Sequence, residues 1–197
     1  CKRYKLRSQS IPLTSNLIPP ISDLLFLSSS LSLLPMSNSL PHDHITPFKD
    51  SEKGKKEQVA DMFDKIAPKY DAMNRVLSAR TDIGWRKKAI NMLRKDSPQH
   101  ILEVATGTAD MAIMTCKMLN PEKIDGIDIS VGMLELGRKK IEKEQLIHKI
   151  ELHTGDSETI NFADNTFDAV MVAFGVRNFE NLEKGLSEII RVLKPGG

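Results

Sequence analysis

The stretch ILEVATGTADMA, residues 101–112, decides the fold of this chain. An apolar run stops at Gly107, crosses Thr108 and Ala109, and resumes with an acid followed by more apolar residues. This pattern predicts a buried parallel strand that turns tightly into a helix around a phosphate or a nucleoside. The residues around the turn indicate which of these two ligands it binds.

Apolar runs of strand length recur after this stretch, and helical patterns separate them. We expect strands at 100–106, 123–129, 149–154 and 167–174, and helices at roughly 110–119, 131–146 and 182–193. The strands show no clean period of two, which is typical of strands buried on both faces of a parallel sheet. The alternation predicts an α/β fold, a doubly wound and Rossmann-like parallel sheet with right-handed crossovers.

The residues ahead of this sheet have a helical pattern. Apolar side chains repeat at three and four positions after Gln58, and Pro68 is expected to end that helix. The segment YDAMNRVLS (70–78) predicts a second short helix. A third helix is expected to carry one apolar face, formed by Trp85, Ala89, Met92 and Leu93.

Composition is that of a soluble globular domain. The 197 residues are 40% hydrophobic and 27% charged, with room for one ordinary α/β domain. The net charge of +2 arises in the first 35 residues, which contain four basic residues and a single acidic one, Asp23. The remainder is near neutral and lacks the basic footprint of a nucleic-acid-binding protein. Two cysteines form no disulfide framework, so we expect a reducing compartment.

The two ends of the chain differ from its middle. Residues 1–35, with LLFLSSSLSLLP at 24–35, form a leader that we interpret as translated upstream sequence before Met36, with a transit peptide as the rival interpretation. Residues 36–57 read as a flexible lead-in and 58–197 as the folded domain. RVLKPGG (191–197) ends a helix where a further strand would begin, so we expect an incomplete domain without its C-terminal strands.

Acidic residues stand at the ends of three predicted strands. Glu103 suits a ligand that carries an ammonium group and would repel a pyrophosphate. Asp128 follows Gly107 by 21 residues, where an acid accepts hydrogen bonds from ribose hydroxyls. Asp156 and Ser157 end the third strand, where an adenine amino group could be bound. Helix capping is the alternative role for any one acid, but three together favour a ligand site.

The turn itself argues against phosphate. A dinucleotide site needs glycines where this chain has Ala109 and Ala112, and no Gly-Lys-Ser/Thr follows for a P-loop. A nucleoside with an amino-acid tail demands less of the turn. At Glu103, Gly107 and Asp128 the chain resembles the class I S-adenosylmethionine-dependent methyltransferases. The resemblance implies S-adenosylmethionine as the cofactor.

A narrower resemblance covers residues 58–197. YDAMNRVLSARTDIGW (70–85), FADNTFDAVMVAFGVRNF (162–179) and RVLKPGG (191–197) are similar to segments of the ubiquinone and menaquinone biosynthesis C-methyltransferases. Asp82 stands where the family usually has His, and Ala109 where it usually has Gly. The resemblance implies C-methylation of a prenylated quinol ring. The lead-in and the mild charge favour the menaquinone branch over the ubiquinone branch.

Residue matching within this family also implies positions for the site. It puts Thr108, Asp128, Asp156 and Ser157 on the cofactor, and it puts five residues at the quinol pocket, namely Tyr70, Asp71, Asn74, Arg177 and Asn178. A cation beside the quinol oxygen would stabilise its negative charge, and Arg177 is our candidate, with a surface salt bridge as its alternative role. The ring proton would leave through Tyr70, Asp71 or a water, a choice that the sequence leaves open.

Other functions stay open at this stage. The chain could methylate another small molecule, such as a sterol or a phenol, or be an inactive fragment. A prenylated quinol implies peripheral contact with a membrane surface, so we expect a cytoplasmic protein at the inner membrane, or an organellar one if residues 1–35 are a transit peptide. His148 and His153 lack acidic or thiol partners at motif spacing, so no metal site is predicted.

Overall fold

A computed structural model describes residues 47–48, 52–77 and 81–197 of the chain. The predicted leader and most of the predicted lead-in lie outside these residues. The elements in chain order are α1 (Lys55–Leu77), α2 (Thr81–Leu93), β1 (His100–Val104), α3 (Asp110–Leu119), β2 (Lys123–Asp128), α4 (Val131–Lys143), β3 (Ile150–Thr154), β4 (Ala169–Val172), the 3-10 helix η3 (Gly175–Asn178) and α5 (Leu182–Val192). Among these elements, no helix is both long and apolar enough to cross a bilayer.

The four strands form one parallel sheet in the order β3-β2-β1-β4. All four predicted strands are present with somewhat narrower bounds, and α3 has the predicted bounds of 110–119. From β1 the chain adds β2 and β3 on one side and then crosses back to add β4 on the other side of β1. The predicted doubly wound α/β fold is confirmed.

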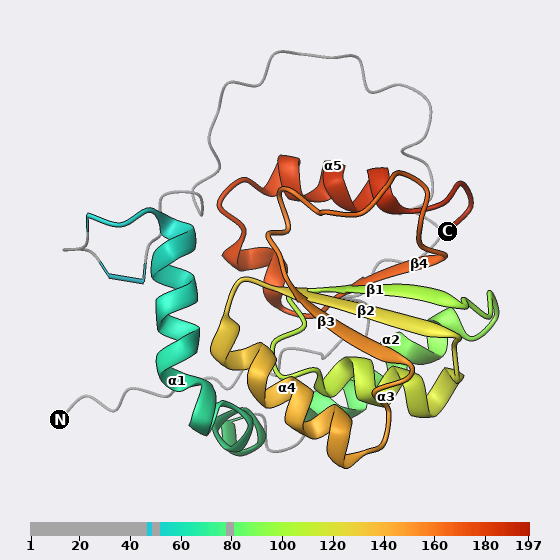
Figure 1. Cartoon of the computed structure of the whole chain (residues 1–197), viewed down its shortest axis with the longest axis horizontal. Helices are drawn as coiled ribbons and strands as arrows, with labels where there is room; N and C mark the ends of the chain where they lie inside the picture. Colours follow the sequence, from blue (N-terminus) through green and yellow to red (C-terminus); the bar gives the residue numbers. More distant parts are fainter. Residues whose placement is uncertain (1–46, 49–51, 78–80) are drawn as a thin grey trace, which may run out of the picture. The chain divides into compact units, whose positions relative to one another are not determined.

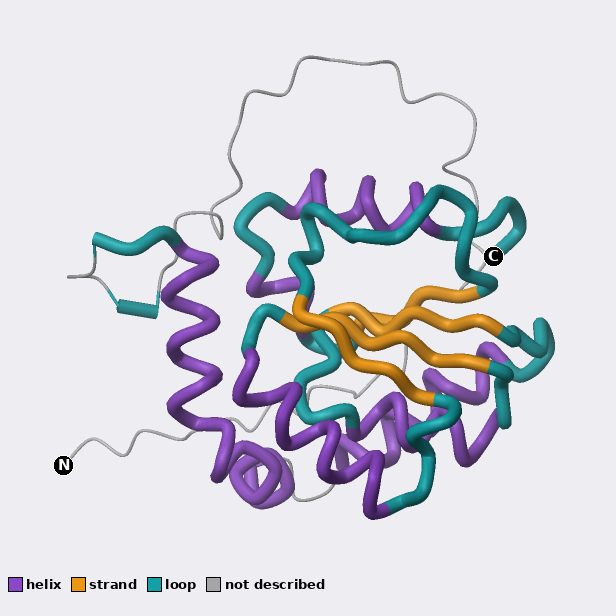
Figure 2. Tube along the Cα trace, viewed as in Figure 1, coloured by secondary structure: helices purple, strands orange, loops and turns teal. Residues whose placement is uncertain are grey.

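Helices cover both faces of this sheet. Figure 1 shows α2, α3 and α4 on one face and α5 on the other, and Figure 2 shows the strands as a layer between them. Side chains from α3, α4 and the sheet form one hydrophobic core, which includes the fully buried Ile101 and Leu134. A second core packs under α5 around the fully buried Phe167 and Val192. Burial on both faces explains why β1 and β2 lack alternating polarity, whereas β3, at the edge of the sheet, alternates between buried and exposed residues over Ile150–Leu152.

Helix α1 differs from the prediction, because Pro68 lies inside it and does not end it. The segments on either side of the proline belong to one helix, and Figure 2 shows the tube of α1 changing direction along its length. Contacts to distant residues hold both halves. Asp64 accepts hydrogen bonds from Ser130 Oγ at 2.6 Å and Gly132 N at 2.9 Å, and Asp71 accepts one from Thr108 Oγ1 at 2.7 Å.

Helix α2 also differs from its expected packing. Trp85, Ala89 and Met92 of the predicted apolar face are exposed, with Trp85 61% and Met92 60% exposed. Only Leu93 of that face packs against the core, together with Ile90, which is fully buried and was not part of the prediction. Apolar residues occur on more than one side of this helix, so their spacing alone could not select the buried side.

The beginning of α1 falls within the predicted flexible lead-in over 36–57. Lys55 is buried, and its Nζ donates to the carbonyl oxygen of Phe179 at 2.9 Å. Gln58 Nε2 donates to Lys53 O at 2.6 Å. Helix α1 therefore begins inside the predicted lead-in, at a lysine that is held by a residue far along the chain.

Candidate cofactor and substrate site

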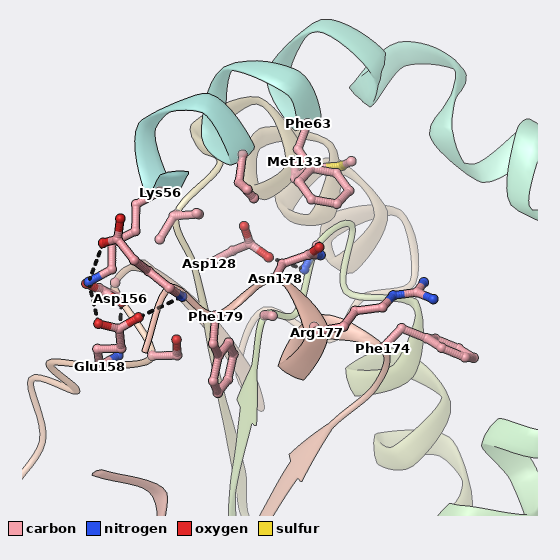
Figure 3. Close-up of a pocket in the computed structure, with 18 of the residues that line it drawn as sticks. Lys56, Phe63, Asp128, Met133, Asp156, Glu158, Phe174, Arg177, Asn178 and Phe179 are labelled. Atoms are coloured by element: carbon pink, nitrogen blue, oxygen red, sulfur yellow. Dashed lines mark hydrogen bonds and ion pairs between the residues drawn. The ribbon is translucent and has the colours of Figure 1, made fainter. Parts of the chain in front are cut away.

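A cavity of about 100 Å³ opens at the carboxyl ends of all four strands. Its lining includes the last residue of β2, Asp128, and a residue from the loop after each of the other strands, namely Gly107, Asp156 and Phe174. Ligands of doubly wound sheets bind at this edge, where neighbouring strands run on to opposite sides. The first turns of α1 contribute Val59 and Phe63 to the lining, and Figure 3 shows Phe63 there.

The turn after β1 has an unusual backbone. Ala105, Gly107 and Ala109 have φ values of 55°, 57° and 60°, in the left-handed region that favours glycine. The methyl group of Ala109 is buried towards Gly137 of α4, where an added Cβ would lie 3.3 Å from it. Alanine in place of the family's usual glycine therefore adds backbone strain and takes no space from the cavity.

The loop after β4 packs closely against this turn. A Cβ added to Gly175 would lie 2.4 Å from the Cβ of Ala105, so only glycine allows this approach. The approach brings η3 to the edge of the cavity, where Arg177 and Asn178 form part of the lining. The contact between Gly175 and Ala105 thus brings Arg177 and Asn178, both predicted from the sequence, to the site.

Asp128 connects the turn to β2. Its Oδ2 accepts a hydrogen bond from Gly107 N at 2.7 Å, and its Oδ1 accepts one from Ser130 N at 2.9 Å. Burial raises the pKa of this carboxyl, although the backbone hydrogen bonds partly oppose the shift. A carboxylate has about four acceptor positions, so two remain for a ligand in the cavity.

Asp156 and Ser157 line the same cavity, but Asp156 has a partner that the sequence did not reveal. Lys56 Nζ lies 2.7 Å from Asp156 Oδ2 and 2.8 Å from Glu158 Oε2. Figure 3 shows Lys56, Asp156 and Glu158 together at one end of the cavity. Lys56 belongs to the predicted lead-in, and nothing in its local sequence indicates a site residue.

Glu158 joins this end of the site to the loop before α5. It is 4% exposed, and its Oε1 accepts hydrogen bonds from Glu180 N at 2.9 Å and Asn181 N at 2.7 Å. Its other oxygen pairs with Lys56. One buried carboxylate thus holds the start of α1 and the loop after η3 against the cavity.

Glu103 lies at a smaller cavity of about 40 Å³, which shares five lining residues with the main one: Tyr70, Ala105, Gly107, Ala173 and Phe174. The side chain is 2% exposed and accepts a hydrogen bond from Thr106 Oγ1 at 2.7 Å. Burial raises the pKa of Glu103 to about 7, with Thr106 and the charge of Arg86 opposing the shift. Glu103, which the sequence predicts to bind an ammonium group, therefore lines a smaller cavity that adjoins the main cavity.

This pKa predicts how stability depends on pH. The folded pKa of about 7 exceeds the usual pKa of a glutamate carboxyl, 4.5, so between these values the folded protein holds a proton that the unfolded chain has lost. The stability that the neutral, protonated Glu103 gives the folded protein is complete below the unfolded pKa and is lost as pH rises through the folded pKa. We expect wild-type stability to fall by up to about 1.4 kcal/mol per pH unit relative to Glu103→Gln. Urea unfolding from pH 4.5 to 7.5 measures this difference, and equal slopes would contradict it.

Thr108 and Asp71 lie beside the smaller cavity and bind each other. Thr108 Oγ1 donates to Asp71 Oδ1 at 2.7 Å and lies 2.8 Å from Lys140 Nζ. Lys140 also pairs with Asp71 Oδ2 and with Asp110. These contacts of Asp71 attach α1 to the glycine turn and to α4.

Tyr70 and Arg177 lie on the main cavity itself. Tyr70 packs edge-on against Phe63, with ring centroids 5.9 Å apart. Arg177 extends beside Phe174, and its Cζ lies 5.6 Å from the ring centroid. Figure 3 shows this pair at the end of the cavity opposite Lys56 and Asp156. The side chain of Asn74 lies outside the described part of the chain.

A second polar cluster lies along the sheet. Buried Asp125 accepts hydrogen bonds from the Nε2 atoms of His100 at 2.8 Å and His153 at 2.9 Å, so the acidic partner of His153 comes from the neighbouring strand. Asp125, Glu151 and His153 are close enough for a metal. However, Lys123 Nζ lies 3.2 Å from Asp125 Oδ1 and 2.9 Å from Glu151 Oε2. A lysine ammonium thus already supplies the positive charge.

The fold and this site define a Rossmann-like domain of the class I methyltransferase type. Solved structures with this fold include a SAM-dependent methyltransferase from Thermotoga maritima, with a TM-score of 0.54, 23% identity, and coverage of 70% of this chain and 57% of that one. The [4+2]-cyclase SpnF aligns with a TM-score of 0.59 and 20% identity, covering 71% and 57%. The fold therefore does not determine the reaction.

Sequence comparison assigns the family. The model of the ubiE/COQ5 methyltransferase family matches residues 51–197, and the chain belongs to this family. Demethylmenaquinone methyltransferase of Bacteroides fragilis is 54% identical over 157 residues, covering 80% of this chain and 64% of that protein. Ubiquinone/menaquinone biosynthesis C-methyltransferase UbiE of Geobacter sulfurreducens is 44% identical over 154 residues, covering 78% and 59%. The chain thus spans slightly less than two thirds of these relatives.

Proposed function

We propose that this chain forms the cofactor-binding part of an S-adenosylmethionine-dependent methyltransferase that methylates a ring carbon of a prenylated quinol in menaquinone biosynthesis. The observation that carries the proposal is the cavity at the four strand ends. Its lining includes both Asp128, a carboxylate in the position that binds ribose hydroxyls, and the guanidinium of Arg177. Family membership and the name of the Bacteroides relative support the quinol and the menaquinone branch.

The residues present fit this cofactor. Asp128 has acceptor positions left for two ribose hydroxyls, and Asp156 and Ser157 lie where an adenine would end. Glu103 provides a carboxylate for an ammonium group in the adjoining compartment. Bound S-adenosylmethionine would supply an electrophilic methyl group on a sulfonium sulfur.

The remaining steps belong to the chain's own side chains. Apolar residues of α1 and α4, among them Val59, Phe63 and Met133, line the cavity and exclude water from the reacting groups. The Arg177 guanidinium would stabilise negative charge on the quinol oxygen, which makes the adjacent ring carbon nucleophilic. Tyr70 lies on the main cavity, whereas Asp71 lines only the smaller one, so Tyr70 or a water is better placed to accept the ring proton.

Methyl transfer itself tests the proposal. The protein as its gene encodes it would be incubated with methyl-labelled S-adenosylmethionine and, separately, demethylmenaquinol, a demethylated benzoquinol and an unprenylated phenol. We expect label in the menaquinol ring above all. Label in the phenol alone would contradict a quinol substrate, and label in the benzoquinol alone would contradict the menaquinone branch.

A prenylated substrate also requires access to a membrane, and we propose that α2 contacts its surface. Trp85 and Met92 are exposed on this helix, and their spacing of seven residues puts them on one side of it. An indole and a thioether on one exposed helix side suit the interface of a bilayer. We expect flotation with anionic liposomes to weaken in Trp85→Ala, and flotation that is equally strong in this variant would contradict the contact.

A further inference from the structure

Arg86 lies on the inward side of α2, which the sequence pattern did not identify. It precedes Ile90 and Leu93 by four and seven residues, so all three share one side of the helix. Ile90 is fully buried and Leu93 packs against the same core. The Arg86 side chain is only 14% exposed. A charged group in this position needs a compensating partner.

The described residues give the Arg86 guanidinium no hydrogen-bond acceptor. Its Nε is buried without a partner among them. Its Nη2 lies 3.8 Å from Asp82 Oδ2 and its Nη1 lies 3.9 Å from Asp110 Oδ2, both beyond hydrogen-bond range. Asp110 is itself bound by Lys140 at 2.6 Å. The two carboxylates thus attract the guanidinium without using its five N–H donors.

These donors border the smaller cavity. Arg86 lines it together with Glu103, Thr106, Gly107 and Thr108. Gly107 also lines the main cavity, and its N–H is bound by Asp128. A ligand whose ribose binds Asp128 could therefore extend past Gly107 into a compartment that presents one carboxylate and one guanidinium.

We propose that Arg86 binds the carboxylate of the amino-acid tail of S-adenosylmethionine, an inference that rests on the proposed function. The tail carries one ammonium and one carboxylate, which match Glu103 and Arg86. Guanidinium and carboxylate groups form two parallel hydrogen bonds, so one ligand group would satisfy several orphaned donors at once. A neutral end of the ligand would leave these donors unsatisfied.

Three related ligands separate this contact from the rest of the site. S-adenosylmethionine carries the carboxylate, decarboxylated S-adenosylmethionine lacks only that group, and 5′-methylthioadenosine lacks the whole tail. Calorimetry would compare their affinities for the 197-residue chain and for Arg86→Met, Arg86→Lys and Lys88→Met. Lys88→Met is the matched control, because it removes one positive charge from an exposed position of the same helix.

We expect wild type to bind S-adenosylmethionine about ten- to a hundredfold more tightly than its decarboxylated form. Arg86→Met should bind these two ligands equally and should keep wild-type affinity for methylthioadenosine. Arg86→Lys should restore part of the preference, and Lys88→Met should retain all of it.

Several results would overturn the proposal. One is a preference for the carboxylate that survives in Arg86→Met. Another is an equal loss of methylthioadenosine and S-adenosylmethionine in that variant, which would indicate a structural role. Wild type that binds methylthioadenosine but not S-adenosylmethionine would refute the tail subsite alone. Wild type that binds none of the three would refute the proposed cofactor, and this contact with it.

Discussion

Replacing Arg177 with alanine is expected to lower kcat about a hundred- to a thousandfold, the usual loss for one preorganised electrostatic donor. Arg177 lines the main cavity at the end away from Asp156, so its removal should leave cofactor affinity unchanged. The measurement pairs methyl transfer to demethylmenaquinol, by the protein as its gene encodes it, with calorimetry of S-adenosylmethionine binding.

Two comparisons sharpen this experiment. Arg177→Lys should recover only part of kcat, since an ammonium lacks the planar fork of donors. Arg94→Ala removes an exposed arginine from the turn after α2 and should have no effect. The oxidised quinone lacks the acidic hydroxyl, so turnover should require a reductant. Equal turnover of both redox forms would refute the quinolate mechanism, and full activity of Arg177→Ala would exclude this residue from it.

Asp128→Ala is expected to weaken S-adenosylmethionine binding by roughly ten- to a thousandfold. Each charge-assisted hydrogen bond to a ribose hydroxyl contributes about 1.5–3 kcal/mol, and 1.4 kcal/mol corresponds to a tenfold change in affinity. The substitution also removes the acceptor for Gly107 N, so the glycine turn loses its link to β2. Calorimetry on the 197-residue chain measures the effect.

Asp128→Asn should give an intermediate affinity, because it keeps one acceptor oxygen. Its amide nitrogen would face the N–H of Gly107 or Ser130, since each carboxylate oxygen accepts from one of them. Glu135→Ala, which removes an exposed acid from α4, is the matched control for charge. Equal affinities for wild type and Asp128→Ala would remove the ribose assignment.

The positions of the strand-end residues could be predicted because parallel topology is a strong constraint. Once apolar runs alternate with helical patterns, the carboxyl end of every strand must reach one edge of the sheet. Gly107, Asp128, Asp156 and Ser157 follow those ends in the sequence, and the structure gathers all four on one cavity. Arg177 and Asn178 could be placed there only by family resemblance.

Local sequence was misleading where distant contacts decide the outcome. Pro68 predicts the end of a helix, yet α1 continues because Asp64 and Asp71 attach its two halves to α4 and to the glycine turn. Lys56 reads as part of a polar lead-in, yet it pairs with Asp156 and Glu158 about a hundred residues away. Neither contact has a local signature.

The sequence by itself determined the doubly wound sheet, the turn around Gly107 and the acids at the strand ends, because these depend on periodicity and chain order. Only the tertiary structure decided which side of α2 is buried. Helical spacing predicted a buried face of Trp85, Ala89, Met92 and Leu93, but in the structure only Leu93 of these packs against the core, and Ile90 is buried beside it. That selection turned Arg86 towards Glu103 and the glycine turn, because residues spaced by three or four positions share one side of a helix.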